Sequence, residues 1–279
     1  MENRIISEEI IQAYQQYLID EEKSAATVEK YLRDVRAFYC YIQNEEITKE
    51  LVVKYKKELQ ERGYAVRSIN SMLAAMNSFL MYMGWSECRV KFLKLQKQIY
   101  CAKDKELTKA EYERLLMATN KNEKLRLVMQ TICSSGIRVS ELRFFTVDAV
   151  RRGEIVVSCK GKTRIILIPG RLRKLLLCYA ARCGIKKGTI FLAKSGLPLN
   201  RKIIWALMKG LCKRAGVNPC KVFPHNLRKL FARTFYKMER DIAKLADVLG
   251  HSSIETTRIY IMSSGNEHRR KIERLGLVV

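Results

Sequence analysis

Hydrophobic residues recur at helical spacing from the N-terminus up to Gly84, and no proline interrupts them. Apolar residues that return every three to four positions favour amphipathic helices over strands. Four such segments follow one another: 7–22, 27–42, a third that ends at Gly63 and a fourth that ends at Gly84. The pattern predicts a compact N-terminal domain of four helices.

The rest of the chain is predicted to combine helices with a small sheet. Thr108-Lys109-Ala110-Glu111 has the pattern of a capping box, which begins a helix. Two β-branched runs, 154–159 and 163–168, flank Lys160-Gly161-Lys162 and predict a β-hairpin. Further helical patterns lie at 125–132, 171–182, 200–214, 226–238 and 241–249, with a basic one in the tail at 267–277.

The expected fold class is therefore mainly α with a small β-sheet. A chain of 279 residues is too long for one typical core and suits two domains. We expect a helical domain at 1–90 and an α+β domain with a C-terminal tail at 107–279. Between them, basic and apolar residues alternate over 91–106, which is typical of a linker.

Positive charge is concentrated in the second domain. Lys and Arg exceed Asp and Glu by 53 to 28 overall, but by only 15 to 14 over residues 1–100. Between Glu154 and Glu239 the sequence has 20 basic residues and no acidic one. A solvated surface normally mixes both signs, so this density indicates a polyanionic partner, above all nucleic acid. An anionic membrane is a weaker alternative, because the charge does not follow one amphipathic helix.

Several other classes of protein are not indicated. No run of about 18 apolar residues is present, and the N-terminus lacks a secretory signal, so we expect a cytoplasmic protein without a membrane partner. The nine cysteines are scattered without a Cys-x-x-Cys pair. Neither a zinc site nor a disulfide framework is therefore predicted.

The first candidate for chemistry is Ser135-Gly136-Ile137-Arg138-Val139-Ser140-Glu141-Leu142. Gly136 is expected to end a helix and Arg138 to open the next turn. An arginine there can direct two donors at the oxygens of a phosphate. Taken alone, the arginine is better explained as a surface residue or as one paired with Glu141.

Lys160 is the second candidate, at the turn of the predicted hairpin. A lysine there can reach into a groove and donate a proton to a leaving oxygen. Lys162 competes for this role, and a solvated turn lysine is the simpler explanation of either residue.

Two further motifs contain histidines, of which the chain has only three. In Pro224-His225-Asn226-Leu227-Arg228, Pro224 suits a helix start and places His225 and Arg228 on one face of the first turn. In the stretch from Leu249 to Ile261, Gly250 ends a helix, His251 follows, and Tyr260 comes nine residues later. The segment between them, 252–257, is predicted to be a weakly helical spacer that lets the tyrosine move.

In this order, the motifs resemble those of the tyrosine recombinases of the phage-integrase and Xer family. SGIRVSEL is similar to the family's first arginine motif, HNLRKLFART to its His-x-x-Arg motif and LGHSSIETTRIYI to its histidine-to-tyrosine motif. The turn lysine lies between them, as in the family, and the four-helix region resembles the core-binding domain. The likeness covers nearly the whole chain.

The resemblance implies a role for each matching residue. Tyr260 would be the nucleophile that forms a 3′-phosphotyrosyl link, and Arg138 and Arg228 would hold the phosphate oxygens. Lys160 would protonate the leaving 5′-oxygen, and His225 would act as base or acid toward the tyrosine. His251 would donate a hydrogen bond to a phosphate oxygen, and Glu141 would orient the site. DNA contacts are expected from Lys162, Arg164, Lys229 and Arg258. Lys229 stands where many relatives have a histidine, so a helper role at that position is in doubt.

The resemblance also implies what the enzyme needs and binds. The covalent intermediate conserves bond energy, so no metal, ATP or other cofactor is expected. The expected partner is double-stranded DNA, enclosed by a C-shaped clamp, with a homotetramer in the synaptic complex and a monomer in the free state. A type IB topoisomerase and a non-catalytic DNA-binding protein are the alternative functions; the separate N-terminal domain and the tail after Tyr260 favour recombination over the first.

Overall fold

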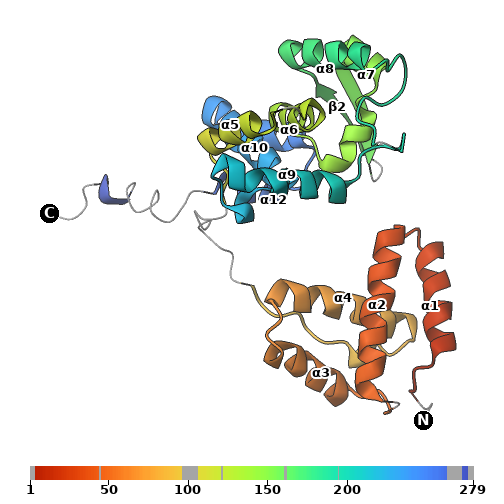
Figure 1. Cartoon of the computed structure of the whole chain (residues 1–279). Coiled ribbons are helices and arrows are strands. Elements are labelled where there is room, and N and C mark those ends of the chain that lie inside the picture. The colour runs from red at the N-terminus through yellow and green to blue at the C-terminus, as the bar shows by residue number, and fades with distance from the viewer. Residues whose placement is uncertain are drawn as a thin grey trace. The chain divides into compact units, whose positions relative to one another are not determined.

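The computed structural model describes residues 4–43, 45–95, 106–120, 122–159, 162–193, 195–262 and 272–275, with only the backbone at Cys159 and Lys162. The chain divides into two compact units, Met1–Lys97 and Gln98–Val279. Helices dominate both units, and the described residues contain a single two-stranded sheet (Figure 1). The predicted fold class, mainly α with a small β-sheet, is confirmed.

The first unit contains the four predicted helices and a short 3₁₀ turn: α1 (Glu8–Asp20), α2 (Ala25–Ile42), α3 (Lys49–Glu61), α4 (Val66–Tyr82) and η1 (Ser86–Cys88). The first three helices begin where a hydroxyl side chain accepts a hydrogen bond from the backbone N–H three residues later. These capping residues are Ser7, Ser24 and Thr48. The predicted ends of the third and fourth helices are confirmed, since Gly63 and Gly84 follow α3 and α4 with positive φ.

The apolar faces of these helices form the core of the first unit. Tyr14 and Phe79 are fully buried and meet edge to face, with ring centroids 5.2 Å apart. The Asn77 side chain donates to the Val90 carbonyl and accepts from its N–H, at 2.9 and 3.0 Å. Asn70 makes the same pair of bonds to Leu93. The chain is therefore held on α4 as far as Leu93, inside the predicted linker 91–106, whose residues 96–105 lie outside the described part.

The second unit is a helical domain with a hairpin: α5 (Lys109–Ala118), α6 (Glu123–Ser135), η3 (Val139–Phe144), α7 (Val147–Arg152), β1 (Glu154–Cys159), β2 (Lys162–Leu167), α8 (Gly170–Arg182), α9 (Arg201–Ala215), η4 (Pro219–Lys221), α10 (Pro224–Glu239), α11 (Ile242–Leu249) and α12 (Ile254–Ile261). The predicted capping box of Thr108 and Glu111 begins α5. The short elements η3 and α7 were not predicted. The predicted tail helix at 267–277 lies largely outside the described residues.

The hairpin and α6 position the site. β1 and β2 pair antiparallel from Glu154↔Leu167 to Cys159↔Lys162, and residues 160–161, which join the two strands in sequence, lie outside the described part. Figure 1 shows the hairpin beside α7 and α8, while α6 packs against α10 in the body of the unit. In the described part of the chain, no helix is long and apolar enough to cross a membrane.

Candidate active site

The turn that carries Arg138 depends on a glycine. α6 ends at Ser135, and Gly136 follows in the left-handed region with φ +63°. A Cβ at this position would lie 2.3 Å from a ring carbon of Phe231 on α10, so both the backbone and the packing require glycine. Arg138 then caps the N-terminal end of η3, as the predicted helix end at Gly136 implied.

Glu141 fixes the orientation of Arg138. This carboxylate is buried, and one oxygen accepts from the Arg138 backbone N–H at 2.7 Å while the other accepts from Nη1 at 3.2 Å. Arg138 Nη2 donates to the Gly250 carbonyl at 3.1 Å. The arginine side chain nevertheless stays 41 % exposed. Its guanidinium is thus fixed in direction while part of it remains available to a ligand.

Arg228, the other predicted phosphate-binding arginine, is almost completely buried on the first turns of α10. It donates to the carbonyl of Gly136 at 2.5 Å and to that of Leu249 at 2.7 Å. Both carbonyls lie at helix C-terminal ends, where backbone oxygens lack intrahelical partners and carry partial negative charge. Burial, followed by the positive charge of Arg138, lowers the pKa of Arg228 to about 10, so the guanidinium remains charged at neutral pH.

Three successive carbonyls at the end of α11 each accept from a different arginine. Val248 accepts from Arg164 at 2.7 Å, Leu249 from Arg228 at 2.7 Å and Gly250 from Arg138 at 3.1 Å. A helix C-terminus therefore gathers three cations that a sequence would place on the surface. Because these acceptors are neutral carbonyls, Arg228 keeps its positive charge for an anionic ligand.

Tyr260 lies between the two histidines of the site. Its ring meets His225 and His251 edge to face, with centroid distances of 5.1 and 5.0 Å. The tyrosine is 7 % exposed and packs in a small apolar cluster with Leu245 and Leu249 of α11. It is therefore more buried than a typical surface tyrosine, and its ring is held firmly.

His251 has a defined tautomer in this arrangement. Its Nε2 lies 2.9 Å from Arg228 Nη2, and its Nδ1 lies 2.8 Å from the Thr257 hydroxyl. Since a guanidinium can only donate, Nε2 must accept, and Nδ1 carries the proton. Burial and the charge of Arg228 lower the pKa of His251 to about 4, which agrees with a neutral ring. Although His225 is an exposed residue, partial desolvation of its ring and then the charge of Lys229 lower its pKa to about 4 as well.

The predicted spacer between His251 and Tyr260 is only partly a loop. Ser253 caps α12, which begins at Ile254 and so includes the last four residues of the segment 252–257. Thr257 is fully buried, one helical turn before Tyr260. That spacing places the two residues on one helix face and is the signal that identifies Thr257 as part of the site.

The other predicted site residues are distributed differently. Lys160 lies outside the described residues, and Lys162 is described by its backbone alone, as the first residue of β2. Arg258 is 45 % exposed and lies 3.5 Å from Glu255. Lys229 is half-buried on α10. Arg164, predicted as a DNA contact, is only 13 % exposed; it donates to Glu141 of η3 and to the Val248 carbonyl at the end of α11.

The described residues contain no cluster of His, Cys, Asp or Glu suited to hold a metal ion. What the site offers is a set of positive charges around an aromatic hydroxyl. Such an arrangement can bind a phosphate and stabilise negative charge that develops on it. The sequence had indicated six of the residues gathered at this site, but not the backbone carbonyls, Thr257 or the position of Arg164; the six are Arg138, Glu141, His225, Arg228, His251 and Tyr260.

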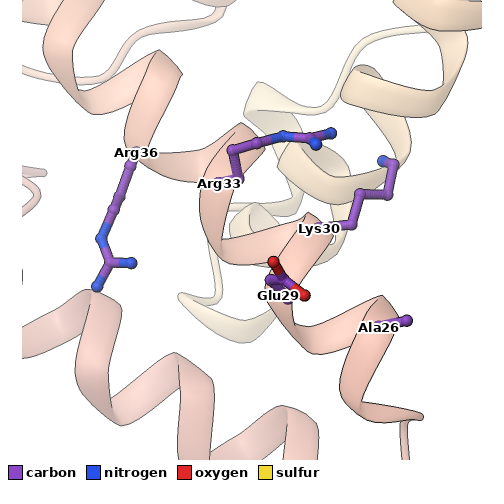
Figure 2. Close-up of a pocket in the computed structure, with 5 residues that line it drawn as sticks. All are labelled: Ala26, Glu29, Lys30, Arg33 and Arg36. Carbon is purple, nitrogen blue, oxygen red and sulfur yellow. The ribbon is translucent and has the colours of Figure 1, made fainter. Parts of the chain in front are cut away.

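A second basic surface lies in the first unit, on α2. A cleft of about 430 Å³ is lined by Ala26, Glu29, Lys30, Arg33 and Arg36, as Figure 2 shows. Lys30 and Arg33 share one buried carboxylate, Asp34, at 2.7 and 3.0 Å. A neighbouring cleft continues across the same two cations to the start of α4. That helix begins at Val66 without a side-chain cap.

Comparisons with known proteins agree with this geometry. Residues 105–267 match the Phage integrase family, and residues 11–87 match the N-terminal SAM-like domain of phage integrases. The chain is 27 % identical to tyrosine recombinase XerA of Pyrococcus furiosus, over 100 % of this chain and 98 % of that protein. It is 28 % identical to tyrosine recombinase XerD of Halalkalibacterium halodurans, over 84 % of this chain and 86 % of that protein.

Solved structures share the fold. The XerH site-specific recombinase bound to its difH substrate superimposes with a TM-score of 0.70 and 18 % identity, covering 96 % of this chain and 84 % of that one. A lambda integrase dimer bound to a COC′ core site gives a TM-score of 0.75 and 18 % identity, covering 94 % and 96 %.

Proposed function

The chain belongs to the Phage integrase family, and from that premise we propose that it cuts and rejoins DNA with Tyr260 as its nucleophile. It is a tyrosine-type site-specific recombinase. One observation supports the assignment of roles above all others: Tyr260 lies between two neutral histidines, and one of them contacts the buried Arg228. A structural tyrosine does not need this environment, whereas a phosphate-attacking one does.

In the proposed cleavage step, the Tyr260 oxygen attacks the scissile phosphorus and the bond to the 5′-oxygen breaks. A 3′-phosphotyrosyl link forms, and the proton of the tyrosine passes to the neutral imidazole of His225. Lys160 gives a proton to the departing 5′-oxygen. In strand exchange a second 5′-hydroxyl attacks the phosphotyrosyl link, and the proton transfers run in reverse. The bond energy is conserved, so we propose that neither metal nor ATP takes part.

Arg138 and Arg228 would stabilise the negative charge on the non-bridging oxygens during both steps. His251 has a more specific part. In the arrangement described above its Nε2 accepts a hydrogen bond from Arg228, so the imidazole orients the Arg228 guanidinium. To donate to a phosphate oxygen, as the family resemblance implies, His251 must release Arg228 and move its proton to Nε2 when DNA binds.

DNA is the partner that these surfaces fit. We propose that the enzyme acts on double-stranded DNA in the cytoplasm, as a monomer when free and as a homotetramer when two sites are joined. Lys162, Lys229 and Arg258 would add further contacts between the second unit and the DNA phosphates.

The function is tested by recovering the DNA that becomes covalently attached to the protein and sequencing it. We expect one recurring sequence, and we expect a plasmid with two copies of it to yield exchanged products. A plasmid without the sequence should stay supercoiled. Site-independent relaxation would favour a topoisomerase, and the absence of any covalent DNA would favour a plain DNA-binding protein.

The α2 cleft gives a separate prediction about DNA affinity. Arg33→Ala should weaken binding and reduce the slope of log Kobs against log salt by about 1, since one phosphate contact is lost. The variant should fold normally, because Lys30 still neutralises Asp34. Fluorescence anisotropy at several salt concentrations measures both effects.

Arg62→Ala is the matched control. It removes the same charge from the same unit, but Arg62 pairs with Glu58 on α3 and does not line the cleft. Equal slopes for the two variants would show that the cleft contacts no phosphate.

A further inference from the structure

Arg164 on β2 joins three segments that are distant in sequence. Its Nη1 donates to the Val248 carbonyl at the end of α11, and its Nη2 donates to Glu141 of η3 at 2.6 Å. β2 itself follows the hairpin turn that contains Lys160. One largely buried guanidinium thus connects the hairpin, the support of Arg138 and the turn that leads to His251.

Gly250 shows how closely this side chain is packed. A Cβ added to Gly250 would lie 2.5 Å from Cδ of Arg164, well inside any real contact distance. Gly250 also has φ +63°, so it needs to be glycine on conformational grounds. The middle of the Arg164 side chain therefore lies directly against the turn whose carbonyl binds Arg138.

Charge is the second consequence of its position. Glu141 is buried and accepts from two arginines: Arg138, through its backbone N–H and Nη1, and Arg164 through Nη2. The oxygen that faces Arg164 is the one that also accepts from the Arg138 backbone. Without Arg164, the full carboxylate charge would be left to Arg138 alone in a site of low dielectric. Arg138 would then have less positive charge to offer a phosphate and would be drawn toward Glu141.

We propose that Arg164 is a positioning residue for the cleavage reaction and not a DNA contact. It neutralises Glu141 so that Arg138 remains directed at the scissile phosphate, and it anchors the hairpin of Lys160 to the end of α11. This inference rests on the proposed function, because it concerns the charge that Arg138 brings to that phosphate.

The test compares Arg164→Met with the wild type in single-turnover adduct formation on a nicked DNA substrate containing the recovered site. Methionine keeps the length and packing of the side chain without its charge. Misplacement of a catalytic group by about 1 Å lowers rates by about 10²-fold, and we expect a loss of that order. The Kd for DNA should stay within about threefold, since Arg164 is not proposed to touch a phosphate.

A methylphosphonate at the scissile position separates positioning from general damage. This group lacks the negative charge that Arg138 neutralises, so the ratio of wild-type to Arg164→Met rates should shrink toward one. A merely structural defect would reduce the rate on both substrates by the same factor. Equal ratios, or a wild-type rate for Arg164→Met on normal DNA, would overturn the proposal.

Two further variants complete the design. Arg164→Lys keeps the charge but can reach only one of the acceptors Val248 and Glu141, so its rate of adduct formation on normal DNA should lie between those of the wild type and Arg164→Met. Its difference from the wild type should also shrink on the methylphosphonate substrate. This variant replaces Arg164→Met if that protein does not fold. Arg151→Met is the control, because Arg151 is 63 % exposed on the same unit and pairs only with Asp148 among the described residues. Its rates should match the wild type. If the wild type itself forms no adduct, the proposed function fails; if it does and Arg164→Met is unaffected, only this inference fails.

Discussion

Tyr260→Phe is expected to abolish the covalent protein–DNA adduct, a loss of about 10⁴-fold or more, because it removes the one oxygen that attacks phosphorus. DNA binding should persist, since both arginines remain in place. Folding should persist as well, because the ring contributes the apolar contacts with Leu245 and Leu249. The measurement is a denaturing gel of protein incubated with a nicked substrate that traps the intermediate.

Tyr236→Phe is the matched control for this variant. Tyr236 packs at the edge of the same apolar cluster but makes no ring contact with either histidine among the described residues. It should form adduct at the wild-type rate. The reaction is run with EDTA and without ATP, so a wild-type enzyme that fails under these conditions contradicts the absence of a cofactor. An adduct on Tyr260→Phe means that another residue is the nucleophile.

Much of the fold follows from local signals in the sequence. Three of the four helices of the first unit begin at Ser7, Ser24 and Thr48, since hydroxyl caps and apolar spacing act within a few residues. The ends at Gly136 and Gly250 were predictable for the same reason, since both adopt positive φ. In contrast, α7 has only six residues, too few for a helical period to show.

The site was predictable as a set of residues but not as an arrangement. The motifs identified both arginines, both histidines and Tyr260. Nothing in the sequence indicates that Arg228 is buried, because its partners are carbonyls 92 and 21 residues away. Arg164 illustrates the same limit: its charge suggested DNA, whereas its acceptors lie 84 and 23 residues away at the end of α11 and on Glu141. Backbone acceptors carry no signature in the amino-acid sequence.

The second large effect on the cleavage rate is expected when the residue that protonates the leaving group is removed. Lys160→Ala should slow adduct formation by about 10² to 10⁴-fold, the usual contribution of a positioned proton donor. The reason is the leaving group: an alkoxide leaves poorly without a proton. Lys160 and Lys162 are two residues apart in the predicted hairpin, so either ammonium is a candidate by sequence, and Lys162→Ala is the matched variant.

A substrate with sulfur in place of the bridging 5′-oxygen distinguishes the two lysines. A thiol has a pKa of about 8.5 and leaves as a thiolate without protonation, so this substrate no longer needs the acid. Lys160→Ala should therefore cleave it at nearly the wild-type rate, while Lys162→Ala, which loses one proposed phosphate contact, should be slowed by the same small factor on both substrates. Rescue of Lys162→Ala instead would transfer the role to Lys162. A Lys160→Ala defect that persists on the sulfur substrate would mean that Lys160 holds the phosphate and does not protonate the leaving group.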